Sequence, residues 1–236
     1  MSLSDWKDAL AILAPGTHPV DSGALADMQA MAVARAVAHH SGSRPRILVE
    51  DLAGNGSADY DLAGAGLTEW DDDFSVIRRV ETPVDDAAGT STALEEDEGD
   101  WRVYDLPDGR KLRLAASVAL GETIRVTYSA RHQVDEHTDT IPLIDQPAVQ
   151  ALAASFYCRM LASAYASSRD STIAADSVDH GRTNANFIKL AQEYRAEYDS
   201  RFGAKEAPAK AAGVIADRDQ ATGYGADRLT HPRRMR

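Results

Sequence analysis

Residues 140–203 constrain the fold most, because their apolar residues recur at the spacing of two amphipathic helices joined by a polar connector. Asp145 and Pro147 predict the start of the first helix, the acidic residue as its cap and the proline in its first turn. Its buried stripe is predicted to comprise Val149, Leu152, Ala153, Phe156, Met160, Leu161 and Ala164, with Tyr157 and Tyr165 beside it.

The second helix of this run is predicted over residues 183–202, after the connector 170–179, and Gly203 ends it. Its apolar positions are Phe187, Leu190, Ala191, Tyr194 and Tyr198. Neither helix has the layout of an active site. Helices that are so well patterned without carrying chemistry indicate packing, both within the chain and against other chains.

Two further helices are predicted near the start of the chain. The first covers residues 4–13 and is ended by Pro15 and Gly16. The second covers residues 22–40, can be capped by Asp21 or Ser22, and is broken by the Ser-Gly-Ser sequence of residues 41–43.

The periodicity then changes from helical to alternating. Short segments rich in β-branched and aromatic residues predict strands at residues 47–49, 74–80, 101–106, 111–114 and 122–130. In the last of these, Ile124, Val126 and Tyr128 alternate with polar residues, which places one face in a core. Residues 107–109, Pro-Asp-Gly, predict a turn. The strands predict a small antiparallel unit, a sandwich or an open barrel, with residues 85–100 as an acidic loop.

The fold class is therefore predicted to be α+β: an α-helical bundle with an inserted small antiparallel β unit and an extended C-terminal tail. Residues 1–43 would contribute the N-terminal helices of the bundle, residues 44–139 the β domain, and residues 140–203 a C-terminal helical hairpin. Residues 204–236 show no sustained periodicity and carry little apolar surface, so we expect this tail to become ordered only on a partner.

The charge is large and unevenly distributed. The formal net charge is −12, and residues 69–100 carry twelve acidic residues against two basic ones, whereas residues 204–236 carry seven basic residues against four acidic ones. An acidic body of this kind argues against a nucleic-acid-binding surface, which needs clustered basic residues. No basic segment followed by an apolar run opens the chain, and no apolar run approaches membrane length, so we expect a soluble protein made in the cytoplasm.

Several clusters of residues are candidate sites of chemistry. Cys158 lies on the apolar side of a predicted helix, which favours a buried thiol over a catalytic one. His132, Asp135, Glu136, His137 and Asp139 stand close together as metal ligands often do, but without a helical metal-binding register. The acidic runs 71–73 and 95–98 lack the alternating ligands and central glycine of a calcium loop, which favours a solvated rim.

The remaining clusters also have structural interpretations. The glycine-rich segments 54–57 and 64–66 lack the spacing of a phosphate loop or a dinucleotide-binding fingerprint and are interpreted as turns. Asp176, Ser177, Asp179 and His180 lack the strand-to-helix elbow of a hydrolase nucleophile, so a helix-capping role is favoured. We therefore expect no enzymatic activity, no cofactor and no metal.

Six ordered blocks resemble the head-to-tail adaptor, or connector, proteins of tailed bacteriophages and prophages. The blocks are WDDDFSVIRRVETPVDD (70–86), VYDLPDGRKLRL (103–114), ETIRVTYSARH (122–132), TIPLIDQPAVQALAASFYCRMLASAYA (140–166), DSTIAADSVDHG (170–181) and FIKLAQEYRAEYDSRFG (187–203). The resemblance spans roughly residues 47–203, the majority of the chain.

This resemblance implies a structural protein of the virion neck whose copies form a twelve-fold ring beneath the portal. Such a ring extends the DNA channel, through which DNA passes without specific binding, and gives the stopper or tail its docking site. The predicted helices would form the ring wall, and residues 204–236 would clamp the portal protein. The tail residues assigned to portal binding are Tyr224, Arg228, Leu229, His231, Arg233, Arg234 and Arg236. Tyr165, Tyr194 and Tyr198 are predicted at the seam between neighbouring subunits.

Two other classes remain open at the level of sequence. One is another neck or tail component, such as a stopper or a tail terminator, which would share the β content. The other is a β-sandwich protein that binds or hydrolyses a glycan through its acidic loops, with Trp70 and Trp101 as candidate sugar platforms. The simplest adaptors lack a β unit of this size, so the sequence leaves open whether the unit faces outward or towards the next neck protein.

Overall fold

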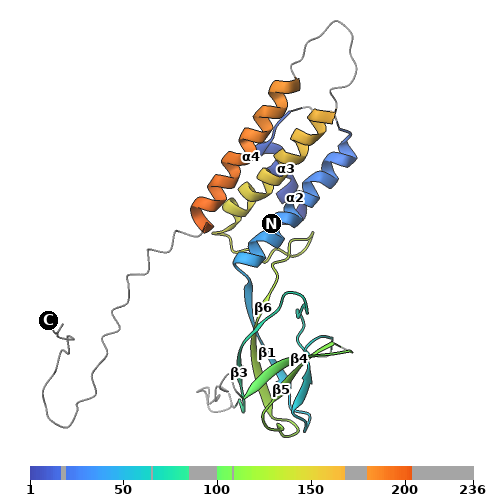
Figure 1. Ribbon diagram of the computed structural model, residues 1–236, viewed down its shortest axis with the longest axis vertical. Coiled ribbons are helices and arrows are strands. Elements are labelled where there is room, and N and C mark those ends of the chain that lie inside the picture. Colours follow the sequence, from blue (N-terminus) through green and yellow to red (C-terminus); the bar gives the residue numbers. More distant parts are fainter. Residues whose placement is uncertain (17–19, 65, 85–99, 108, 168–179, 204–236) are drawn as a thin grey trace, which may run out of the picture. The chain divides into compact units, whose positions relative to one another are not determined.

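The structure is a computed structural model that describes residues 1–16, 20–64, 66–84, 100–107, 109–167 and 180–203 (Figure 1). The fold is mixed α+β, as predicted. The helices are α1 (Leu3–Leu13), α2 (Ser22–Ser43), α3 (Gln146–Ser167) and α4 (His180–Phe202). The strands are β1 (Arg46–Ala53), β2 (Asp59–Asp61), β3 (Ile77–Glu81), β4 (Trp101–Leu106), β5 (Gly109–Leu114) and β6 (Thr123–Ala130). Residues Met1–Arg201 form one compact unit, and Phe202–Arg236 form a second.

Side-chain caps begin the first two helices. Ser2 and Asp5 form a reciprocal capping box at the start of α1, and the Asp21 carboxylate accepts a hydrogen bond from the Ala24 amide at the start of α2, at 2.9 Å. Helix α2 continues past its predicted end at residue 40 to Ser43, and within it the Ser41 and Ser43 hydroxyls donate to the carbonyls of Val37 and His40. The predicted break at residues 41–43 was therefore wrong.

Helix α3 is buried on almost every side, whereas the sequence pattern predicted a single buried stripe. Val149, Leu152 and Leu161 are buried as predicted, but Ala154 and Ser155, which lie off that stripe, are also buried. Small residues allow this, because alanines let neighbouring helices approach closely without leaving voids. Helices α1 and α2 both contact α3, and the Phe187 ring of α4 stacks on Tyr165 of α3 with ring centroids 5.4 Å apart.

The strands form two antiparallel three-stranded sheets, with the orders β1-β6-β3 and β2-β5-β4. The predicted bounds of β4 were correct, whereas β1 is longer than predicted and β2 was not predicted at all. Strand β3 begins later than residue 74 because the amides of Phe74 and Ser75 both donate to the Asp71 carbonyl and close a turn. Asp108, the centre of the predicted turn between β4 and β5, lies outside the described residues.

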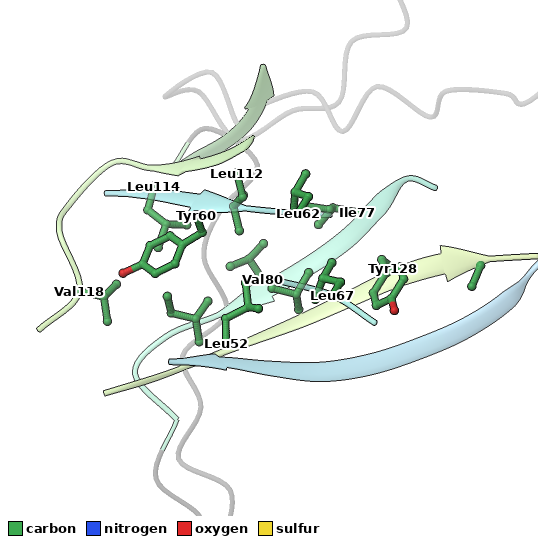
Figure 2. Close-up of a cluster of buried hydrophobic side chains, with 13 residues drawn as sticks. Leu52, Tyr60, Leu62, Leu67, Ile77, Val80, Leu112, Leu114, Val118 and Tyr128 are labelled. Carbon is green, nitrogen blue, oxygen red and sulfur yellow. The ribbon is translucent and has the colours of Figure 1, made fainter. Parts of the chain in front are cut away.

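A hydrophobic cluster of described residues fills the space between the two sheets (Figure 2). Strand β6 contributes Ile124, Val126 and Tyr128, all fully buried, as its alternation predicted. Leu112 of β5 and Val80 of β3 meet them from the two sheets. Among the described strands the two sheets stay separate and form no closed barrel. None of the described helices is both long enough and apolar enough to cross a membrane.

Candidate interaction surfaces

The three tyrosines predicted at a subunit seam pack within the chain. Tyr165 and Tyr198 are only 7% and 2% exposed, so their rings have little surface left to offer a neighbour. The Tyr194 hydroxyl donates to the Leu13 carbonyl at 2.8 Å, which ties α4 to the end of α1. The Tyr198 hydroxyl lies 3.2 Å from both His40 Nδ1 and Ser43 Oγ of α2. These side chains hold α4 against α1 and α2, and the assignment of the three tyrosines to a subunit seam stays a prediction.

The seven residues assigned to portal binding, Tyr224, Arg228, Leu229, His231, Arg233, Arg234 and Arg236, lie outside the described residues. The same holds for Asp176, Ser177 and Asp179 of the connector and for the acidic run 95–98. His180 is the first residue of α4. The portal-binding assignment and the capping interpretation both stay predictions.

Of the five residues considered as metal ligands, His132, Asp135 and Asp139 have separate hydrogen-bonding partners. The His132 ring nitrogens face the backbone carbonyls of Thr140 and Arg44, each at 3.0 Å. Asp135 accepts hydrogen bonds from two backbone amides that follow it, and these bonds lower the pKa of its carboxyl group. Asp139 accepts from the Trp6 indole and also pairs with the N-terminal ammonium group. In the described part of the chain, no three His, Cys, Asp or Glu side chains gather as a metal-holding group.

Cys158 is fully buried in α3, and burial raises the pKa of its thiol to about 11. The thiol is therefore protonated at neutral pH and lacks the thiolate character of a nucleophile. This geometry agrees with the structural role predicted for Cys158.

The two tryptophans weighed as sugar platforms lie near each other. Trp70 and Trp101 line one pocket together with Asp105 and Arg110, whose side chains form an ion pair at 2.7 Å. Both rings also pack against the hydrophobic cluster between the sheets, and the Trp70 indole donates to Asp72. These contacts give both rings a structural use.

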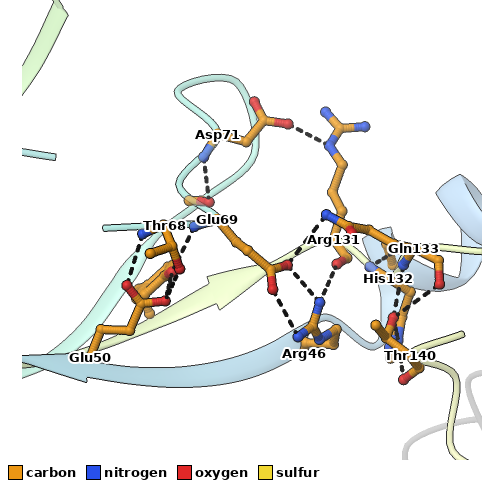
Figure 3. A network of polar contacts seen from close by, with 12 residues as sticks. Arg46, Glu50, Thr68, Glu69, Asp71, Arg131, His132, Gln133 and Thr140 are labelled. Atoms are coloured by element: carbon orange, nitrogen blue, oxygen red, sulfur yellow. Dashed lines mark hydrogen bonds and ion pairs between the residues drawn. The ribbon is translucent and has the colours of Figure 1, made fainter. Parts of the chain in front are cut away.

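A polar network joins the start of β1 to the loop before β3 and to the segment after β6 (Figure 3). Arg46 makes a two-pronged ion pair with Glu69, with nitrogen–oxygen distances of 2.6 and 3.2 Å. Gln133 donates to the same carboxylate, and Arg131 pairs with Asp71 at 2.7 Å. Asp71, in the acidic run 71–73, thus closes a turn through its carbonyl and pairs with Arg131 through its carboxylate.

A pocket of about 480 Å³ lies beside this network, and it gathers positive charge in an otherwise acidic chain. Three arginines line it: Arg44 directly after α2, Arg46 at the start of β1, and Arg78 in β3. We call it the arginine pocket. Sequence reasoning missed it because its residues come from separate segments and include no motif.

Exposed apolar side chains border the arginine pocket. Ile47 and Pro142 line it, and the two residues after Pro142, Leu143 and Ile144, are 80% and 71% exposed. The turn that carries them is fixed, because the amides of Asp145 and Gln146 both donate to the Pro142 carbonyl. Large apolar side chains held out on an ordered turn are typical of protein contact surfaces.

Comparisons with known proteins give a likeness of low score to a solved structure. No family model matches the sequence, and no curated protein matches it. Among solved structures, one match is a chain described as "Neck of empty GTA particle computed with C6 symmetry", with 18% sequence identity over 83% of this chain and 89% of that chain. The TM-score is 0.28, which does not establish a common fold.

Proposed function

We propose that this chain is a structural, non-enzymatic head-to-tail adaptor of a tailed phage or a related particle. Its copies would form a ring under the portal, extend the DNA channel, and provide the docking site for the stopper or tail. The observation that carries the proposal is the ordered series of six adaptor-like sequence blocks between residues 70 and 203. They fall mainly on ordered elements, with the strand blocks on β3 to β6 and the helical blocks on α3 and α4.

The chemistry of the described residues is in keeping with this role. The groups that sequence analysis weighed for catalysis or metal binding, including Cys158, His132 and Asp139, are engaged in burial or in structural hydrogen bonds. In this proposal α2, α3 and α4 form the ring wall, and the two sheets form a sandwich-like unit attached to it. The net charge of −12 keeps contacts with the phosphates of passing DNA weak.

A truncation after Gly203 tests the portal contact, because it removes all seven predicted portal-binding residues. We expect the truncated chain to stay folded and soluble but to lose attachment to tailless, portal-containing heads, measured by co-sedimentation. The matched control is the full chain with Lys205 and Lys210 changed to Gln, which keeps the tail length and the predicted binding residues. Attachment of the truncated chain at the level of the full chain would contradict the clamp.

A second binding experiment separates the adaptor from another neck or tail component. An adaptor binds purified portal rings directly, whereas a stopper or a tail terminator requires an intermediate protein or binds the tail. Mixing the full chain with purified portal rings and separating them by gel filtration distinguishes these cases. Co-elution with the portal supports the adaptor role, and co-elution only with tails would replace it by a tail component.

A further inference from the structure

The arginine pocket has the chemistry of a carboxylate-binding site. Arg44, Arg46 and Arg78 are among the residues that line it, and a guanidinium group is a planar fork of donors that matches a carboxylate. Arg46 already holds Glu69 in this way, which shows that the local geometry suits such pairs. Among the described residues that line the pocket, these three arginines are accompanied by one acidic residue, Asp145, which pairs with Arg201 at 3.0 Å. The pocket therefore keeps a local excess of positive charge.

The apolar border of the pocket indicates a protein ligand rather than nucleic acid. Ile47 is 47% exposed, and Leu143 and Ile144 are more exposed still. Phosphate-binding surfaces of nucleic-acid-binding proteins are broad and strongly basic, whereas this chain carries a net charge of −12. Protein interfaces instead combine exposed apolar anchors with arginine near their centre.

The chain itself contains a segment with the complementary chemistry. The longest acidic run in the sequence is Glu95, Glu96, Asp97 and Glu98, and an apolar residue, Leu94, precedes it directly. Two copies of a chain with a net charge of −12 repel each other, so a stable self-contact needs opposite charges where the copies meet. Closed rings use two different patches on each subunit, and a basic pocket with an acidic run supplies two such patches.

We propose that the arginine pocket binds the acidic run 94–98 of a second copy of this chain, with Arg44 and Arg78 facing its carboxylates and Leu94 against the apolar border. This contact rests on the proposed ring-forming function and names the contact between neighbouring subunits. It accounts for the concentration of arginine at one place in an acidic chain.

A peptide-binding experiment tests the contact whether or not the free protein forms rings. The probe is a fluorescent peptide of residues 91–100, and the receptor is the full chain with Glu95, Glu96, Asp97 and Glu98 changed to Ser, which removes its own competing run. We expect saturable binding by fluorescence anisotropy, weakened by about tenfold or more when Arg44→Glu and Arg78→Glu are added. A peptide with the four acids replaced by Gln or Asn should not bind.

The matched control for the pocket variant is Arg35→Glu with Arg159→Glu, which changes the net charge equally at exposed positions of α2 and α3. Circular dichroism of each variant checks that the fold is kept. The proposal is overturned if the peptide shows no saturable binding, or if the pocket variant and the control variant bind it equally. Binding of a short DNA duplex that only the pocket variant loses would assign the pocket to phosphate instead.

Charge exchange between copies tests the same contact in the assembly. One variant carries Arg44→Glu and Arg78→Glu, and the other carries Lys at positions 95–98. Each variant alone should assemble less than the unmodified chain on portal-containing heads, and a 1:1 mixture should restore assembly, because every pocket then meets a run of opposite charge. Failure of the mixture, with peptide binding absent, overturns the contact. Attachment of single copies to the portal is measured separately. Loss of that attachment would contradict the adaptor role, whereas single copies in the mixture that attach but do not assemble would contradict the self-contact.

Discussion

His40 is a buried histidine whose proton uptake opposes folding. Its side chain is 1% exposed, and its Nδ1 atom lies 3.2 Å from the Tyr198 hydroxyl. Burial, together with the nearby charges of His132 and Arg44, lowers the pKa of His40 from 6.5 to about 4, while Asp145 acts in the opposite direction. The unfolded chain therefore takes up this proton at a higher pH than the folded chain does.

This difference predicts a pH-dependent loss of stability. Because the folded pKa lies below the unfolded one, the contribution of His40 is complete above pH 6.5 and is lost as the pH falls towards 4, by up to about 3 kcal/mol. Urea unfolding at several pH values measures it. His40→Gln should flatten the pH dependence over this range, whereas His137→Gln, at an exposed histidine, should leave it as in the unmodified chain. Equal curves for both variants would contradict the assignment.

Gly54 is required for its small size, because the backbone of a neighbouring segment leaves no room for a side chain. A Cβ atom at this position would lie 2.2 Å from the Ala119 carbonyl oxygen and 3.0 Å from that of Glu122. We expect Gly54→Ala to lower the free energy of unfolding by about 1–3 kcal/mol through this clash. Gly42→Ala is the control, because nothing lies within 4 Å of its Cβ position in α2. That change should raise stability by up to about 1 kcal/mol, and a loss of similar size in both variants would refute the steric argument.

At the scale of elements, α3 is the centre of the helical part of the fold. Leu152 is fully buried in it, whereas Leu143, in the turn before it, is 80% exposed. We expect Leu152→Ala to cost about 2–5 kcal/mol of unfolding free energy and Leu143→Ala less than about 0.5 kcal/mol. Denaturant unfolding of the two variants gives the comparison. A similar cost at both positions would mean that Leu143 is covered within the chain.

The sequence predicted the type of most elements because their apolar period is strong, as in β6, where Ile124, Val126 and Tyr128 all face the core. The sequence could not predict that α3 is buried on almost every side. Alanine occurs on both buried and exposed helix faces, so its burial depends on which helices pack against it. Strand β2 has three residues, which is too short for an alternating pattern to predict a strand. Ser41 and Ser43 were interpreted as breakers, although their hydroxyls bond to carbonyls within α2.

The tertiary contacts of the candidate site residues could not be predicted from the sequence. Tyr165 and Tyr198 have the amphipathic character of interface residues, but an aromatic ring on a helix margin serves equally to bind a neighbouring helix of the same chain. The arginine pocket could not be found by spacing, because Arg44, Arg46 and Arg78 meet only after β1 and β3 have both paired with β6.

At the scale of the whole molecule, the chain divides into two units, and its charge is unevenly distributed along the sequence. Residues Met1–Arg201 form a compact unit with its own hydrophobic cluster between two sheets and a helical part centred on α3. The remaining residues, Phe202–Arg236, form the second unit. Residues 204–236 carry seven basic residues against four acidic ones, the reverse of the body. That this segment becomes ordered on a partner stays a prediction from its composition.

The stability of the compact unit Met1–Arg201 should therefore not depend on residues 204–236. We expect a chain ending at Gly203 to unfold within about 2 °C of the full chain in a thermal scan, because its buried residues and the ion pair between Arg201 and Asp145 are all retained. A chain ending at Ala191 serves as the control: it removes Tyr194 and Tyr198, with their hydrogen bonds to α1 and α2, and should unfold at a clearly lower temperature. If loss of the tail alone lowers the midpoint as much as loss of the second half of α4, the tail is part of the folded body, and its assignment to partner binding is wrong.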